Sequence, residues 1–160
     1  MRRRGRIRVR VGDIFVVPMS EGLPVYGQVI AQSGTQFLVV LFRKSGSIDE
    51  AITSGIELAG VVFDAKWRNG DWPIVENRPP AAVKTPWFVV GHLDLGNVRL
   101  TNFDGTIERP ATAAEASRHR NRAVAYPMAL QMAAEAAHGV RRWSSEFDRF
   151  RELGAELASG

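Results

Sequence analysis

The feature that most constrains the fold is a dense hydrophobic stretch over residues 11–42. It contains three short runs rich in β-branched and aromatic residues, at 11–18, 25–31 and 36–42. Prolines, glycines and serines separate the runs, and this punctuation is typical of strands joined by turns. The stretch therefore predicts a strand meander, with Ser33-Gly34 as the tight turn between the second and third strands.

The first run is hydrophobic on both sides, because Ile14 and Val16 alternate with Phe15 and Val17. Both faces of the sheet should then be covered, as in a small barrel or a sheet packed by helices. Gly27, near the start of the second run, predicts a bulge or sharp coil. A strongly bent meander of this kind is also how SH3-like barrels begin.

The next segment mixes turn signals with hydrophobic runs. Residues 48–52 fit one helical turn, and residues 56–67 return to strand character. Asn69-Gly70 is a strong hairpin signal, and such a turn would place Trp67 opposite Trp72 in a cross-strand pair. The prolines that follow predict an extended, irregular chain as far as residue 86.

After Pro110 the pattern becomes helical. Thr112 and Glu115 fit a capping box, which predicts a helix from there to about Ala125, where Pro127 bends or restarts it. A last helix should begin at Ser144 or Ser145 and end at Gly154.

These elements predict an α+β fold, in which a strongly bent antiparallel sheet or an SH3-like partly open barrel is followed by C-terminal helices. Three parts are expected: an Arg-rich arm and edge strand (1–10), a β domain (11–108) and a helical extension packed on the sheet (109–160).

Composition excludes several classes of protein. The 160 residues suit one domain with an appended part, and 45% hydrophobic with 24% charged residues is ordinary for a globular chain. With no cysteine, disulfide scaffolds and thiolate metal sites are excluded. No apolar run reaches the roughly 18 residues of a membrane span, and no secretory signal follows the arginines, so we expect a cytoplasmic protein.

The positive charge is concentrated at one end. The net charge is +4, but six of the 21 basic residues lie within the first ten positions, which leaves 15 basic against 17 acidic residues elsewhere. Alternation with Ile7, Val9 and Val11 favours a solvated edge strand. The alternative is a nucleic-acid-binding arm that uses Arg2, Arg3, Arg4 and Arg6.

Catalytic signatures are missing. The sequence contains no nucleophile elbow, phosphate-binding loop or dinucleotide-binding turn. His92 and Asp94 would share one strand face, which could form an acid-base or metal pair, but no third ligand accompanies them. Arg118 and Arg122 could grip phosphates from one helical face, although Glu115 can neutralise Arg118. The sequence therefore favours a non-enzymatic protein without a cofactor.

Aromatic residues are the better candidates for function, because protein interfaces concentrate binding energy in a few Trp, Tyr and Arg anchors. Acidic residues near these aromatics could meet a basic partner. The predicted partner-binding residues are Tyr26, Trp67, Asp71, Trp72, Glu76 and Trp87.

Several of these motifs occur together in one known family. The Gly-Asp-Ile-Phe run at 11–18, the Tyr-Gly-Gln strand at 26–28, and Trp72-x-Ile74 before a Pro-rich turn resemble the immunity protein 26 family of bacterial polymorphic toxin systems. The resemblance spans about residues 7–90. It implies a mainly β, cytoplasmic, non-enzymatic protein that binds and neutralises a cognate toxin, often a nuclease.

Two features depart from that family pattern. The helical C-terminal third is not covered, and the arginine arm is unusual in a protein that would shield a basic nuclease. Three functions are therefore carried forward. The first is an immunity protein acting by steric occlusion, the second a nucleic-acid-binding module with an SH3-like barrel and a basic arm, and the third an enzyme centred on His92 and Asp94.

Overall fold

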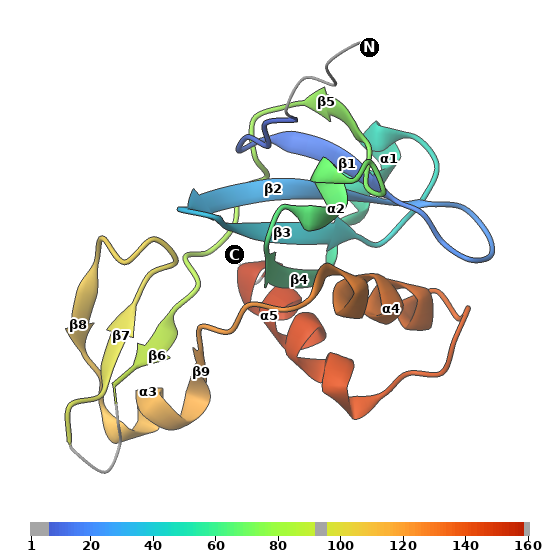
Figure 1. Cartoon of the computed structure of the whole chain (residues 1–160). Coiled ribbons are helices and arrows are strands. Elements are labelled where there is room, and N and C mark those ends of the chain that lie inside the picture. Colours follow the sequence, from blue (N-terminus) through green and yellow to red (C-terminus); the bar gives the residue numbers. More distant parts are fainter. Residues whose placement is uncertain (1–6, 92–95, 159–160) are drawn as a thin grey trace.

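The computed structural model describes residues 7–91 and 96–158, which form an α+β fold with a main body and a smaller lobe (Figure 1). The main body is built on a five-stranded antiparallel sheet of order β4-β3-β2-β1-β5. Its edges, β4 and β5, do not pair, so the sheet is not closed into a barrel. The predicted fold class is confirmed as an open sheet followed by helices. The strands are β1 (Asp13–Val17), β2 (Val25–Ser33), β3 (Gln36–Phe42), β4 (Ile56–Val62) and β5 (Ile74–Asn77).

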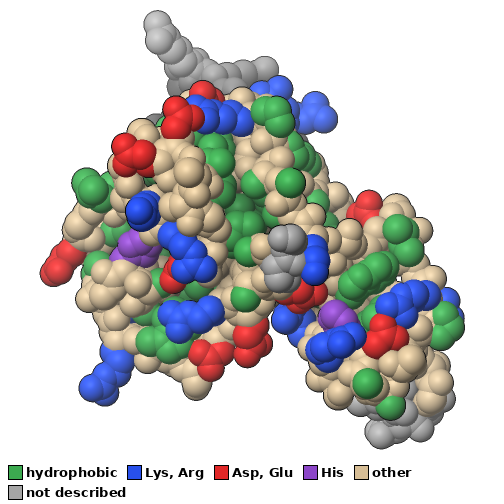
Figure 2. Space-filling model, turned by 180° about the vertical axis from the view of Figure 1, so that it is seen from behind, with side chains coloured by type: hydrophobic (Ala, Val, Ile, Leu, Met, Phe, Trp, Pro, Cys, Tyr) green, Lys and Arg blue, Asp and Glu red, His purple; other side chains and the backbone are tan. Residues whose placement is uncertain are grey.

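The smaller lobe carries a second sheet of order β8-β7-β6-β9 and the helix α3. Strand β9 runs parallel to β6, whereas the other pairs are antiparallel. Seen from behind, the lobe stands to one side of the body (Figure 2). Its elements are β6 (Phe88–Val90), β7 (Arg99–Thr101), β8 (Glu108–Pro110), α3 (Ala113–Arg118) and β9 (Arg120–Asn121).

Hydrophobic clusters lie on the two faces of the main sheet, as the two-sided pattern of the first run predicts. One cluster, the first core, joins Phe15 and Leu41 to Leu130 of α4. The other, the second core, joins Val40 and Ala59 to α1 and α5 and reaches Phe88 in the lobe. The remaining helices are α1 (Ile48–Ser54), α2 (Ala65–Arg68), α4 (Pro127–Ala137), the 3-10 helix η2 (Ser145–Phe147) and α5 (Asp148–Ala158).

The N-terminal meander follows the sequence closely. All three predicted strands form, and Ser33 pairs with Gln36 across a turn in which Gly34 adopts a φ of +58°. The bulge lies between Val29 and Ala31 instead of at Gly27. Gly27 has a different role, since a Cβ there would lie 2.4 Å from the ring of Phe15.

The predicted hairpin at Asn69-Gly70 is wrong. Strand β4 ends at Val62, and the short helix α2 follows, with the Asn69 N–H donating to the carbonyl of Ala65. Asn69 and Gly70 therefore terminate a helical turn. That turn directs Trp67 into the core, where the indole gains far more apolar contact than an exposed hairpin would give.

Two helices of the C-terminal region end at other residues than predicted. The Thr112 capping box forms, but α3 stops at Arg118 instead of about Ala125, because Arg120 and Asn121 pair with β6. The last helix runs past Gly154 to Ala158. Gly154 packs against β4, since a Cβ on it would lie 3.0 Å from the carbonyl oxygen of Glu57, so the glycine permits a close approach and does not end the helix.

Candidate interaction surfaces

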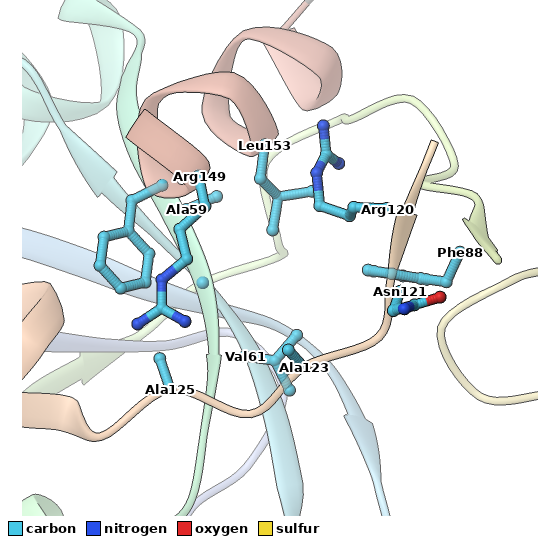
Figure 3. Close-up of a pocket in the computed structure, with 11 residues that line it drawn as sticks. Ala59, Val61, Phe88, Arg120, Asn121, Ala123, Ala125, Arg149 and Leu153 are labelled. Carbon is cyan, nitrogen blue, oxygen red and sulfur yellow. The ribbon is translucent and has the colours of Figure 1, made fainter. Parts of the chain in front are cut away.

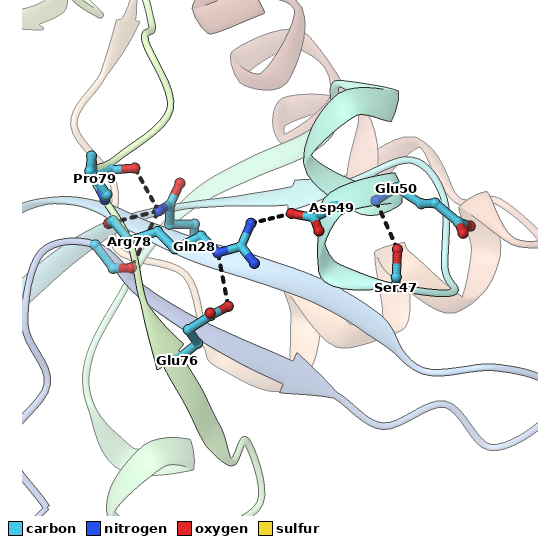
Figure 4. A network of polar contacts seen from close by, with 8 residues as sticks. Gln28, Ser47, Asp49, Glu50, Glu76, Arg78 and Pro79 are labelled. Carbon is cyan, nitrogen blue, oxygen red and sulfur yellow. Dashed lines mark hydrogen bonds and ion pairs between the residues drawn. The ribbon is translucent and has the colours of Figure 1, made fainter.

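Gln28 lies at the centre of a buried polar network (Figure 4). Its side chain is 1% exposed, and Nε2 donates to the carbonyls of Gly12 at 3.3 Å, Arg78 at 3.2 Å and Pro79 at 3.2 Å. Its Oε1 accepts from the Ala81 N–H at 2.9 Å. We call this network the Gln28 latch, because one side chain ties the turn before β1 to the proline-rich segment after β5.

Gly12 and Asp13 complete the latch. Gly12 adopts a φ of +94°, and a Cβ there would lie 2.3 Å from the Arg78 carbonyl oxygen. The Arg78 N–H donates back to the Gly12 carbonyl at 3.0 Å. Asp13 is 2% exposed, and its carboxylate accepts from the Arg10 N–H at 2.8 Å and Asn77 Nδ2 at 2.9 Å. These contacts compensate the cost of burying a charged group.

The outer rim of the latch is charged and exposed. The Arg78 guanidinium donates to Asp49 at 2.5 Å and to Glu76 at 2.9 Å, and these hydrogen bonds raise the pKa of Arg78. Asp49 stands in the first turn of α1, where Ser47 caps the helix by accepting from the Glu50 N–H at 3.1 Å. The Asp49 side chain is 82% exposed, so this edge of the sheet presents acidic groups to solvent.

Two of the predicted partner-binding tryptophans are core residues. Trp67 and Trp72 are 1% and 0% exposed, and both contact Phe15, which stacks on Trp72 with ring centroids 5.4 Å apart. Trp72 Nε1 donates to Gln131 of α4 at 2.9 Å. The expectation that these indoles are displayed is therefore corrected: as buried rings they offer a partner no surface.

Tyr26 and Glu76 lie on one face of the main sheet. Tyr26 is opposite Val16 and Glu76 is opposite Ile14, and alternate residues of β1 point to the same side. Tyr26 is half-buried against the second core, and Glu76 is exposed. These two predicted residues therefore share a surface with the rim of the latch.

Asp71 and Trp87 lie elsewhere. Asp71 is exposed in the loop between α2 and β5, with a carboxylate oxygen 3.4 Å from Lys66 Nζ. Trp87 is half-buried where the lobe meets the body. Its backbone N–H donates to Glu156 of α5 at 3.3 Å, and the Arg109 guanidinium lies 5.4 Å from its ring centroid. The six predicted residues do not form a single patch.

The predicted phosphate grip does not form. The helix ends before Arg122, whose guanidinium instead donates to Gln36 Oε1 at 2.7 Å and to the Phe103 carbonyl. It also lies 4.4 Å from the Phe103 ring centroid, and burial lowers its pKa. Arg122 therefore fastens the lobe to β3.

The remaining candidates for catalysis and nucleic-acid binding lie outside the described residues: His92, Asp94, Arg2, Arg3, Arg4 and Arg6. On the face in Figure 2, Lys and Arg side chains are interspersed with Asp and Glu. Within residues 7–91 and 96–158, no group of three or more His, Cys, Asp and Glu side chains could hold a metal ion. None of the helices in these ranges is both long and apolar enough to cross a membrane.

One feature that the sequence reasoning missed is a small apolar hollow between β4, β9 and α5 (Figure 3). Its volume is about 160 Å³. Its walls come from segments far apart in the chain, so no local pattern could have revealed it. They include Ala59, Val61, Phe88, Ala123, Arg149 and Leu153.

Comparison with known protein families tests the family resemblance that the motifs containing the latch residues suggest. Residues 10–95 match immunity protein 26. The chain belongs to this family. The matched segment contains the whole main sheet and every residue of the Gln28 latch, so the motifs that carry the resemblance act as scaffold. Comparison with curated proteins and with solved structures gives no match. Family membership indicates an immunity protein with a cognate toxin as partner, and favours a non-enzymatic role.

Proposed function

We propose that this immunity protein binds its toxin directly and blocks it by covering the toxin's active site. The single observation that carries the proposal is the family match over residues 10–95. Steric occlusion needs a partner-sized surface, of roughly 800 Å² on each protein, held in its binding shape before the toxin arrives.

The scaffold supports such a preformed surface. The Gln28 latch fixes the segment after β5, and the stacked rings of Phe15 and Trp72 fix the opposite face of the sheet. A surface that is already ordered loses little conformational entropy on binding, which leaves more of the contact energy as affinity.

We place the toxin on the sheet face that carries Tyr26 and Glu76. Tyr26 supplies an aromatic contact, and Glu76 with Asp49 supplies acidic groups suited to a basic surface, such as that of a nuclease. Trp87 and Asp71 remain proposed contributors at the margins of this contact.

Co-expression with the toxin encoded beside this chain tests the proposal. The protein should restore growth of cells that produce the active toxin. It should also form a one-to-one complex with a catalytically inactive toxin in size-exclusion chromatography. A toxin from an unrelated system is the control, and it should give neither result. Absence of both protection and complex with the neighbouring toxin would remove this function.

A further inference from the structure

The hollow between β4, β9 and α5 has the size of one apolar side chain. A cavity of about 150 Å³ lined by apolar groups holds a benzene ring, so about 160 Å³ suits a phenyl or leucine-type group. Small side chains account for the space: Ala59 and Gly60 on β4, with Ala123 and Ala125 on the chain that leaves β9. These residues leave an apolar recess at the junction of body and lobe.

Exposed aromatic residues follow directly after the two residues of a β-bridge, one of which, Ala125, lines the recess. Val62 and Ala125 form a parallel bridge, and the next residues along each segment are Phe63 and Tyr126. Phe63 is 45% exposed and Tyr126 is 84% exposed. Tyr and Phe are among the residue types enriched at protein interfaces, and exposed apolar groups that lie together mark interaction sites.

A positively charged side chain, that of Arg149, borders the recess. The Arg149 guanidinium lies 4.6 Å from the ring centroid of Phe150 and, in Figure 3, points toward Ala125. Within the described part of the chain it forms no ion pair. Arg120, which also borders the recess, is neutralised by Glu156 at 2.5 Å. The free positive charge is therefore on Arg149, beside an apolar pocket.

We propose that this hollow receives a phenyl or leucine-type side chain of the toxin, flanked by a carboxylate that pairs with Arg149. The inference rests on the proposed function and names the chemistry of one segment of the partner. The hollow lies at the β4 edge of the main sheet, where it borders the second core, against which Tyr26 also packs, and the first core at Ala125 and Phe150. The bound toxin would set a basic region against the acidic β5 edge and an acidic, apolar segment against the β4 edge.

A peptide experiment tests the hollow without the toxin. The probes are acetyl-Gly-Glu-Phe-Asp-Gly-amide, its Lys-Phe-Lys counterpart, sodium octanoate and a five-nucleotide single-stranded DNA, each titrated into the full ¹⁵N-labelled chain. The acidic peptide should shift the Val61 and Ala123 amides and bind at least tenfold more tightly than the basic peptide. Ala123→Trp should abolish these shifts, and Arg149→Glu should reverse the preference between the two peptides.

The neighbouring toxin gives the second readout. Ala123→Trp, which fills the hollow from an exposed position, should weaken toxin binding at least 100-fold, and Arg149→Glu at least 10-fold. The matched controls Ala155→Trp and Arg142→Glu, at exposed positions away from the hollow, should stay within threefold of the parent protein. Circular dichroism on each variant verifies that it is folded.

The outcomes separate the inference from the function. If the parent chain binds the toxin and both hollow variants bind equally well, the inference fails and the immunity function stands. If the parent chain neither binds nor protects, the immunity function fails, and the peptides still decide whether the hollow takes an acidic, apolar segment. Tighter binding of octanoate or DNA than of the acidic peptide would overturn the inference. A dimer of the parent chain that Ala123→Trp converts to a monomer would also overturn the inference.

Discussion

The family-matched segment, residues 10–95, and the part beyond it, residues 96–158, are built in different ways. The matched segment buries three of its motif residues, Gly12, Asp13 and Gln28, inside a hydrogen-bond network that sets the course of the backbone. The later part contributes α4 and α5 as covers, and it completes a lobe held to the body by polar contacts such as Arg122 to Gln36 and Arg120 to Glu156. The matched segment fixes the scaffold, and the two parts together line the recess at their junction.

This contrast shows that buried motif residues by which the family is recognised, such as Gly12 and Gln28, hold the scaffold together instead of lying on its surface. Gln28 is 1% exposed and has its hydrogen bonds satisfied by the chain itself. Arg149 and Tyr126, outside the matched segment, are exposed. A family of binding proteins can keep its scaffold motifs while each member presents a different surface to its own toxin.

The largest expected effect comes from the aromatic core of the matched segment. Trp72→Ala should lower the free energy of unfolding by about 4 kcal/mol, because it removes a fully buried indole and leaves a cavity beside Phe15. Guanidinium denaturation measures the change. Trp143→Ala, at a half-buried indole in the later part, should cost about 1 kcal/mol. Equal losses in the two variants would break the contrast.

The next effect tests the latch. Gly12→Ala should cost about 3 kcal/mol, since the new Cβ would meet the Arg78 carbonyl and the backbone has a positive φ. Gly22 also has a positive φ, of +77°, but a Cβ added there would have no neighbouring atom within 4 Å. Gly22→Ala should therefore lose only about 1 kcal/mol. Urea denaturation of the two variants separates the steric clash from the backbone strain. Similar losses of unfolding free energy in both variants would refute the close approach of Gly12 to the Arg78 carbonyl.

A smaller effect concerns the attachment of the lobe. Arg122→Leu removes the hydrogen bonds to Gln36 and to the Phe103 carbonyl. Amide exchange in β7 should quicken about tenfold, equivalent to about 1.4 kcal/mol, while exchange in β2 and β3 stays unchanged. Hydrogen exchange followed by mass spectrometry measures both regions. A change spread evenly over the chain would show that body and lobe unfold together.

The smallest effect is a pH dependence within the lobe. The Arg109 guanidinium, with the Thr112 N–H, lowers the pKa of Glu115 from 4.5 to about 2. Because the folded pKa is the lower one, the ionised Glu115 stabilises α3 above pH 4.5, and this contribution is lost as the pH falls from 4.5 toward 2. An NMR titration should show α3 loosening over that range. Arg109→Gln should bring the Glu115 pKa back toward 4.5, and an unchanged midpoint would contradict the pairing.

The sequence predicted those parts in which local pattern and final contacts agree. The three runs of residues 11–42 became β1, β2 and β3, and Thr112 with Glu115 formed the predicted capping box. Prediction failed where distant contacts override a local signal. Asn69-Gly70 would suit a hairpin, but burial of Trp67 favours a helical turn. Arg120 would continue a helix, but pairing with β6 draws it into a strand.

The candidate site was only partly predictable for the same reason. A sequence shows that an aromatic residue is present, but exposure depends on what packs over it, so Trp67 and Trp72 could not be told apart from Trp87. The hollow depends on three elements that meet only in the folded chain.

By itself, the sequence determined the family, the fold class and the positions of β1 to β4, because alternating hydrophobicity and turn residues act through neighbours in the chain. Only the tertiary structure decided which tryptophans are sealed, how Gln28 is used and where an unfilled recess lies beside Arg149. Burial and close packing arise between segments that are far apart in the sequence, so they exist only once the chain has folded.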